Sequence, residues 1–122
     1  MIRWGVLSTA KIGREQVIPA ILEAKGASLT GISSRDPKKA KALADHFGAP
    51  FSFGCYEELI SSQHIDAVYI PLPTSDHVNW SIKTAEMGKH VLCEKPIALK
   101  SSDIDRLIET ESQSKVFISE AY

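Results

Sequence analysis

The chain has only two cysteines among its 122 residues, and they do not form a C-x-x-C pattern. Cys55 and Cys93 lie far apart, and Cys93 falls in an apolar run that predicts a buried strand. Isolated cysteines of this kind are typically reduced thiols in a core. We therefore expect no disulfide framework, no metal site and a reducing compartment.

Long apolar runs and an excess of charge of one sign are also missing. Fourteen Lys and Arg residues balance fifteen Asp and Glu residues, which argues against a nucleic-acid or other highly charged partner. The first residues, MIRWGVLS, turn polar too early for a signal peptide, and no run approaches the length of a membrane span. We expect a cytoplasmic protein with one domain, residues 1–122, that binds neither nucleic acid nor membranes.

Short apolar runs alternate with helical patterns along the whole chain. The runs that predict strands are residues 2–7, 28–33, 51–53, 67–70, 90–93 and 116–119. The helical patterns cover residues 11–24, 37–47, 56–61, the stretch after His77 as far as Gly88, and a last helix from Ser101 or Ser102. This alternation predicts an α/β fold, the doubly wound Rossmann dinucleotide-binding domain, with six parallel strands in the order 3-2-1-4-5-6.

Local signals predict several helix boundaries. Pro19 should kink the first helix, which Gly26 ends. Asp36 is expected to cap the second helix, with Pro37 in its first turn and Gly48 as its stop.

Apolar spacing predicts which helix faces are buried. In the last helix, Ser102 and Asp105 fit the spacing of a capping box. The expected buried stripes are Val17, Ile18, Ile21 and Leu22 in the first helix, and Ile104, Leu107 and Ile108 in the last.

The turn after the first strand has the form S-x-A-x-x-G, where a dinucleotide-binding fold carries G-x-G-x-x-G. Small residues allow the backbone to approach a pyrophosphate at the helix N-terminus, where free N–H groups favour negative charge. An ordinary strand-to-helix turn is the alternative, because the motif is degenerate. The turn residues that we expect at the cofactor are Ser8, Thr9, Ala10, Lys11, Ile12 and Gly13.

The second strand leads into Ser34 and Arg35, where an NAD site usually has a carboxylate for the ribose 2′-hydroxyl. A hydroxyl and a guanidinium suit a 2′-phosphate, because Arg binds phosphate through two parallel charge-assisted hydrogen bonds. Together with Lys38 and Lys39 on the next turn, they favour NADP over NAD. The alternatives are a solvated Arg35 and an Asp36 that bends back to a ribose.

The loop PLPTSDH after the fourth strand is expected to run along the cofactor near the nicotinamide. Its predicted cofactor contacts are Pro71, Leu72, Pro73, Thr74 and His77. The alternative is plain helix capping by Thr74, Ser75 or Asp76, and both roles can coexist. His77 fits either a surface histidine or a catalytic base.

Glu94, Lys95 and Pro96 follow the fifth strand directly, at the edge where open α/β sheets bind ligands. Lys95 there can donate to a substrate hydroxyl or carbonyl oxygen and, if partly desolvated, exchange a proton. A nearby carboxylate would hold its ammonium, and Pro96 favours a cis peptide. The alternative is a surface Glu-Lys pair before a proline turn.

The segments GVLSTAKIG, SSRDPKKAKALA, PLPTSDH, GKHVLCEKP and SEAY, in this order, resemble the glucose-fructose oxidoreductase / inositol dehydrogenase / rhizopine-catabolism family. The resemblance covers nearly the whole chain, is strongest in GKHVLCEKP, and extends to NADP-dependent dihydrodiol and sugar dehydrogenases. It implies that Lys95 is the catalytic lysine, that Glu94 lies by the nicotinamide ribose, and that Glu120 lies near the nicotinamide end of the cofactor.

The same resemblance implies a hydride transfer between NAD(P) and a sugar, cyclitol or diol substrate. It also implies a C-terminal α+β domain that closes over the substrate and forms homo-oligomers. Ser8 and Ala10 depart from the fingerprint glycines, and the chain ends at Tyr122, where that second domain would begin. We therefore expect a fragment that binds dinucleotide and turns over little. A dinucleotide-sensing regulator of the same fold is the alternative, which the Glu-Lys-Pro context disfavours.

Overall fold

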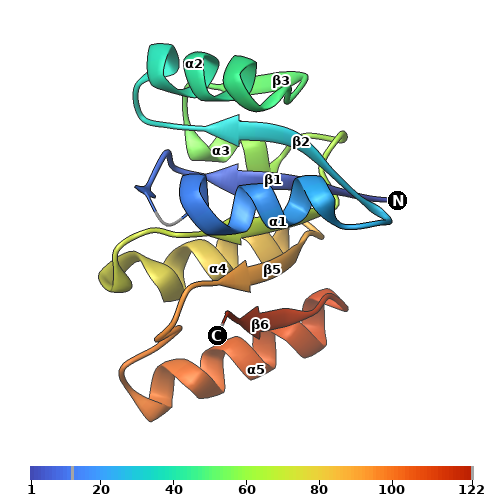
Figure 1. Cartoon of the computed structure of the whole chain (residues 1–122). Coiled ribbons are helices and arrows are strands. Elements are labelled where there is room, and N and C mark those ends of the chain that lie inside the picture. Colours follow the sequence, from blue (N-terminus) through green and yellow to red (C-terminus); the bar gives the residue numbers. More distant parts are fainter. Residues whose placement is uncertain (12, 122) are drawn as a thin grey trace.

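The computed structural model describes residues 1–11 and 13–121, which build one six-stranded parallel sheet. The strand order is β3-β2-β1-β4-β5-β6, and every neighbouring pair is parallel (Figure 1). The strands are β1 (Ile2–Leu7), β2 (Ala27–Ser33), β3 (Phe51–Phe53), β4 (Ala67–Ile70), β5 (His90–Cys93) and β6 (Ile118–Glu120). The predicted fold class and strand order are confirmed.

Helices cover both faces of this sheet, α1 and α2 on one face and α3, α4 and α5 on the other (Figure 1). The helices are η1 (a π-helix, Gly13–Val17), α1 (Ile18–Glu23), α2 (Pro37–Phe47), α3 (Tyr56–Ile60), η2 (a 3₁₀-helix, Thr74–Asp76), α4 (His77–Glu86) and α5 (Ser101–Ser114). Within the described residues, no helix combines the length and the apolar character needed to cross a membrane.

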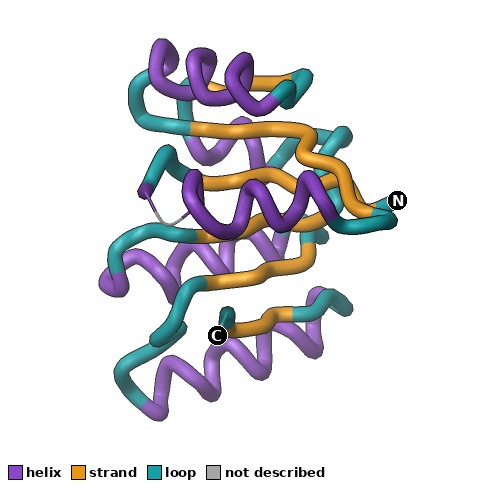
Figure 2. Tube along the Cα trace, in the orientation of Figure 1, coloured by secondary structure: helices purple, strands orange, loops and turns teal. Residues whose placement is uncertain are grey.

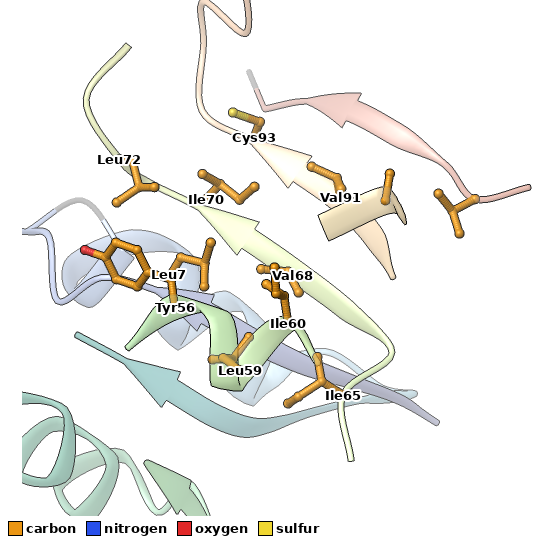
Figure 3. Close-up of a cluster of buried hydrophobic side chains, with 12 residues drawn as sticks. Leu7, Tyr56, Leu59, Ile60, Ile65, Val68, Ile70, Leu72, Val91 and Cys93 are labelled. Carbon is orange, nitrogen blue, oxygen red and sulfur yellow. The ribbon is translucent and has the colours of Figure 1, made fainter. Parts of the chain in front are cut away.

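Alternation along the central strands produces two apolar clusters, one on each face. Val68 and Ile70 of β4 point into the cluster with α3 and α4, whereas Tyr69 between them points into the cluster with α1 and α2. Figure 3 shows the first cluster, with Leu7 at the end of β1 beside Tyr56 of α3. All four residues of β4 are buried, as expected for a strand covered on both faces.

The predicted boundaries of α2 are confirmed. Oδ1 of Asp36 accepts a hydrogen bond from the Lys38 N–H at 2.9 Å, so Asp36 is the N-cap with Pro37 in the first turn. Gly48 ends the helix in the left-handed conformation, with φ of 75°.

The first helix differs from the prediction. Residues 13–17 form the π-helix η1, and Pro19 lies in the first turn of α1 instead of in the middle of one helix. Because proline has no N–H and its ring crowds the preceding turn, it is tolerated at a helix start. Ile18 and Ile21 are buried as expected, but Leu22 is 49% exposed.

The last helix also departs from the prediction. It begins at Ser101 after Lys100, which makes no side-chain capping bond, so Ser102 is inside the helix and the capping box is wrong. Leu107 is buried, but Ile104 and Ile108 are 37% and 60% exposed. These two isoleucines border an apolar groove beside β6, which is the edge strand of the sheet that residues 1–11 and 13–121 build.

Candidate functional site

The loops after β1, β2, β4 and β5 lie together at the carboxyl edge of the sheet, on the left in Figure 2. Between the first three of these loops and the start of α3 is a cavity of about 370 Å³, which we call the crevice. It is lined by Ser8, Thr9, Ser34, Arg35, Asp36, Lys39, Tyr56, Leu72, Pro73 and Asp76. Residues that the sequence assigns to three separate motifs thus face one space, at the switch point where dinucleotides bind in this fold.

The β1 turn shows why a fingerprint normally has glycine here. Ser8 has φ of 102°, a backbone conformation that favours glycine. Its N–H donates to the Ser33 oxygen at 2.9 Å, and its Oγ accepts from the Ala10 N–H at 3.1 Å. The serine therefore adopts the glycine conformation and adds a hydrogen bond that closes the turn.

The other turn residues lie less centrally. Lys11 is exposed and forms a long 4.0 Å ion pair with Glu15. Gly13 is the first residue of η1. The prediction for Ile12 lies outside the described residues.

Arg35 at the end of β2 extends over an aromatic ring. Its guanidinium carbon lies 5.9 Å from the centroid of the Tyr56 ring, which orients the cation along the crevice. Asp36 caps α2, as described above, and Oγ of Ser34 accepts from the Asp36 N–H at 3.1 Å. Asp36 is thereby engaged with its own helix, and the basic side chains Arg35 and Lys39 border the cavity.

Tyr56 is a crevice residue that the sequence reasoning missed. Its ring packs in the apolar cluster, and its hydroxyl points away from that cluster (Figure 3). The available signal was its place just after β3, because residues that follow parallel strands gather at the same sheet edge.

The β4 loop enters the crevice with Leu72 and Pro73, while Pro71 is buried behind them. Thr74 faces a different cavity, beside the start of α5. The predicted side-chain capping is wrong: a 3₁₀ turn precedes α4, the Asp76 N–H donates to the Pro73 oxygen at 2.9 Å, and Asp76 makes no side-chain capping bond.

His77 is a buried histidine, so its interpretation as a surface residue is wrong. Only 1% of the residue is exposed. Nε2 lies 2.6 Å from the Leu72 oxygen and Nδ1 lies 2.8 Å from the Pro96 oxygen. The imidazole therefore connects the β4 loop with the segment that follows β5.

Glu94 at the end of β5 is held from the neighbouring strand. The hydroxyl of Tyr69 donates to its Oε2 at 2.6 Å, and its N–H donates to the Ile70 oxygen at 3.1 Å. Burial raises the pKa of Tyr69, with the Glu94 carboxylate adding to the effect, so the phenol stays a donor. Tyr69 is a second residue that sequence reasoning missed, since it reads as an ordinary core position.

Lys95 is exposed, and the Lys95–Pro96 peptide bond is cis, as the sequence predicted. Among residues 1–11 and 13–121, no ion pair joins Lys95 to a carboxylate, so the expectation that a nearby carboxylate holds its ammonium is wrong. Oε2 of Glu120, from β6, accepts from the Ile97 N–H at 2.8 Å. Glu94, Pro96 and, through Ile97, Glu120 thus hold the segment that contains Lys95, and His77 links this segment to the crevice residue Leu72.

The two cysteines are thiols without a disulfide, and burial raises the pKa of Cys93 to about 12. Cys93 is thus a packing residue beside the site. In the part of the chain that the structure describes, no group of three or more His, Cys, Asp or Glu side chains is placed to hold a metal ion.

Comparison with known proteins adds three findings. Residues 2–122 match the family model described as an oxidoreductase family with an NAD-binding Rossmann fold. The chain is 46% identical to an uncharacterized oxidoreductase, ORF334, of Rhizobium meliloti, over 99% of this chain and 36% of that protein. It is 40% identical to D-xylose 1-dehydrogenase (NADP(+)) 2 of Haloferax volcanii, over 98% of this chain and 36% of that protein.

Among solved structures, the chain resembles KijD10, a 3-ketoreductase from Actinomadura kijaniata crystallised with NADP and TDP-benzene. The TM-score is 0.94 and the sequence identity 32%, over 98% of this chain and 36% of that chain. The chain therefore spans little more than a third of the length of the relatives it matches.

Proposed function

Since the chain belongs to the oxidoreductase family with an NAD-binding Rossmann fold, we propose that it is the cofactor-binding part of an enzyme that acts on a sugar, cyclitol or diol. The bound nicotinamide would supply hydride chemistry, and the protein would bind it, orient it and handle the proton. The observation that carries the proposal is the convergence of the β1 turn, the β2 end and the β4 loop on one crevice, with Lys95 following β5 at the same edge of the sheet (Figure 2).

The β1 turn is proposed to hold the pyrophosphate through its backbone. The small side chains of Ser8 and Ala10 keep the turn open, as the fingerprint requires. The other proposed backbone contacts of the turn are Thr9, Lys11, Ile12 and Gly13.

The β2 end is proposed to select NADP. Arg35 and Lys39 supply positive charge at the crevice, and Ser34 supplies a hydroxyl. Asp36 is a poor candidate for a ribose ligand, because its carboxylate caps α2. Two relatives are consistent with a preference for NADP: KijD10 was crystallised with NADP, and the D-xylose dehydrogenase is named as an NADP(+) enzyme.

Lys95 is proposed to donate a hydrogen bond to the reacting oxygen and to exchange a proton with it. The exposed ammonium at a strand exit can reach an open ligand site, and hydrogen bonds to the backbone of Glu94, Pro96 and Ile97 limit its position from both sides. The nicotinamide side is assigned to Pro71, Leu72, Pro73, Thr74, Glu94, Pro96 and Glu120. The substrate pocket and the homo-oligomer interface would lie in the remaining two thirds found in the relatives.

Two experiments test this proposal. Calorimetric titration of the chain with NADP and NAD should give a lower Kd for NADP, and Arg35→Ala should remove most of that difference. Tighter binding of NAD would refute the assignment of Ser34 and Arg35. In a full-length protein that carries this chain, Lys95→Ala should abolish hydride transfer and leave the cofactor Kd within about threefold; unchanged turnover would refute the role of Lys95.

A further inference from the structure

His77 is the first residue of α4, and it lies between two loops that are distant in sequence. Its Nε2 contacts the Leu72 oxygen of the β4 loop at 2.6 Å. Its Nδ1 contacts the oxygen of Pro96, the residue after Lys95, at 2.8 Å. Only 1% of the residue is exposed, so the ring is enclosed by protein, and each ring nitrogen faces one of these two backbone oxygens.

Carbonyl oxygens accept hydrogen bonds and cannot donate them. Each ring nitrogen that faces a carbonyl therefore makes a bond only while it carries a proton, and a ring with a single N–H would satisfy one loop and leave the other weakly held. Through its contacts with Leu72 and Pro96, the ring bridges the wall of the crevice and the residue next to Lys95. Neither contact leaves a ring nitrogen free for a substrate.

Besides the backbone bond from Glu94 to Ile70, three side-chain hydrogen bonds hold the segment around Lys95. The Glu94 carboxylate accepts from Tyr69, the Pro96 oxygen faces His77, and the Ile97 N–H donates to Glu120. Lys95 lies between these points, with its own side chain exposed. Of the three, only the His77 bridge also connects this segment to the β4 loop, which lines the crevice.

From this geometry we infer that His77 is a positioning residue for Lys95: its contact with the Pro96 oxygen fixes the peptide next to the lysine, and the ring does not itself touch the cofactor. The inference rests on the proposed role of Lys95. Misplacement of a reacting group by about 1 Å is enough to cost on the order of a hundredfold in rate. Loss of the contact with the Pro96 oxygen should therefore lower kcat, while the NADP Kd, which depends on the proposed pyrophosphate and 2′-phosphate contacts, stays unchanged.

Two isosteric substitutions separate the two arms of the bridge. The amide nitrogen of Asn can occupy the place of Nδ1, so His77→Asn can keep the bond to the Pro96 oxygen. The amide nitrogen of Gln can occupy the place of Nε2, so His77→Gln can keep only the bond to the Leu72 oxygen. If the contact with Pro96 positions Lys95, His77→Asn should retain most of kcat and His77→Gln should lose about tenfold to a hundredfold.

The measurement uses the full-length enzyme and follows kcat, KM and the NADP Kd of both variants, alone and combined with Lys95→Ala. Circular dichroism and the NADP Kd report whether each variant is folded. On the Lys95→Ala background, His77→Gln should cause no further loss of kcat, because both changes act on one group.

The outcomes distinguish this inference from the function that it rests on. If Lys95→Ala leaves turnover unchanged, the proposed role of Lys95 fails and this inference falls with it. If Lys95→Ala abolishes turnover but Asn and Gln at position 77 lose kcat equally, the positioning role is refuted. A rise in the NADP Kd of His77→Gln with unchanged kcat would instead make His77 a cofactor-binding residue and would also refute it.

Discussion

The hydrogen bond between Tyr69 and Glu94 provides a quantitative test of how the core supports the site. Tyr69 is fully buried on the α1 side of the sheet, and its hydroxyl donates to Oε2 of Glu94 at 2.6 Å. Tyr69→Phe removes that donor and almost no volume, so it leaves the packing of the ring intact. The change therefore isolates one hydrogen bond to a carboxylate.

The expected cost follows from the surroundings of the two partners. A hydrogen bond to a charged group contributes about 1.5–3 kcal/mol. Glu94 is partly exposed, so water can replace the lost donor and reduce the loss to about 1–2 kcal/mol. For a domain of this size, that loss corresponds to a fall in Tm of roughly 4–8 °C.

The same bond predicts how the difference depends on pH. The pKa of Tyr69 is raised by burial and by Glu94, so in the folded state the phenol stays protonated above its ordinary value of 10.0. A raised pKa stabilises the fold below the unfolded value, and this contribution is lost as pH rises beyond it. The wild-type chain should thus lose stability above about pH 10, and the difference in free energy of unfolding between wild type and Tyr69→Phe should become smaller.

Urea unfolding followed by circular dichroism measures these free energies. Tyr56→Phe is the matched control, because it removes the same atom from a buried ring whose hydroxyl borders the crevice and can exchange with water. We expect a change below about 0.5 kcal/mol for the control. Equal midpoints for wild type and Tyr69→Phe, with equal m-values, would refute the stabilising role of the Tyr69–Glu94 bond.

Two further predictions concern stability. Hydrogen bonds from the Arg3 side chain and backbone lower the pKa of Asp66 to about 2. The ionised Asp66 therefore stabilises the fold above about pH 4, and this stabilisation disappears as pH falls to about 2. Because both side chains are more than a third exposed, Asp66→Asn should lower the free energy of unfolding by only about 1 kcal/mol at pH 7. The difference between wild type and variant should disappear in acid, and a difference that does not change with pH in urea unfolding would contradict this. Ser8→Ala and Ser8→Gly both lose the Oγ bond, but only alanine keeps a Cβ at the φ of 102°, so Ser8→Ala should be about 1 kcal/mol less stable than Ser8→Gly. Equal urea midpoints for the two variants would contradict the strain argument.

Much of the fold was predictable because its signals are local and repeat along the chain. The short apolar runs of β1 and β4, the capping carboxylate of Asp36 and the stop at Gly48 each act within a few residues. The prediction of the buried face of the last helix failed for a physical reason. The exposure of Ile104 and Ile108 depends on β6 being an edge strand, and a helical repeat in the sequence does not encode the position of a strand in the sheet.

The sequence by itself predicted the class of site, because the turn from Ser8, the pair Ser34 and Arg35, and the Glu-Lys-Pro exit indicate the expected chemistry through residue type and order. Only the tertiary structure decided which partners these residues use. It assigns Glu94 to Tyr69 instead of Lys95, Tyr56 to the crevice, and His77 to two backbone oxygens. These contacts join residues that are far apart along the chain, and parallel crossovers bring such residues to one sheet edge only when the whole sheet is formed.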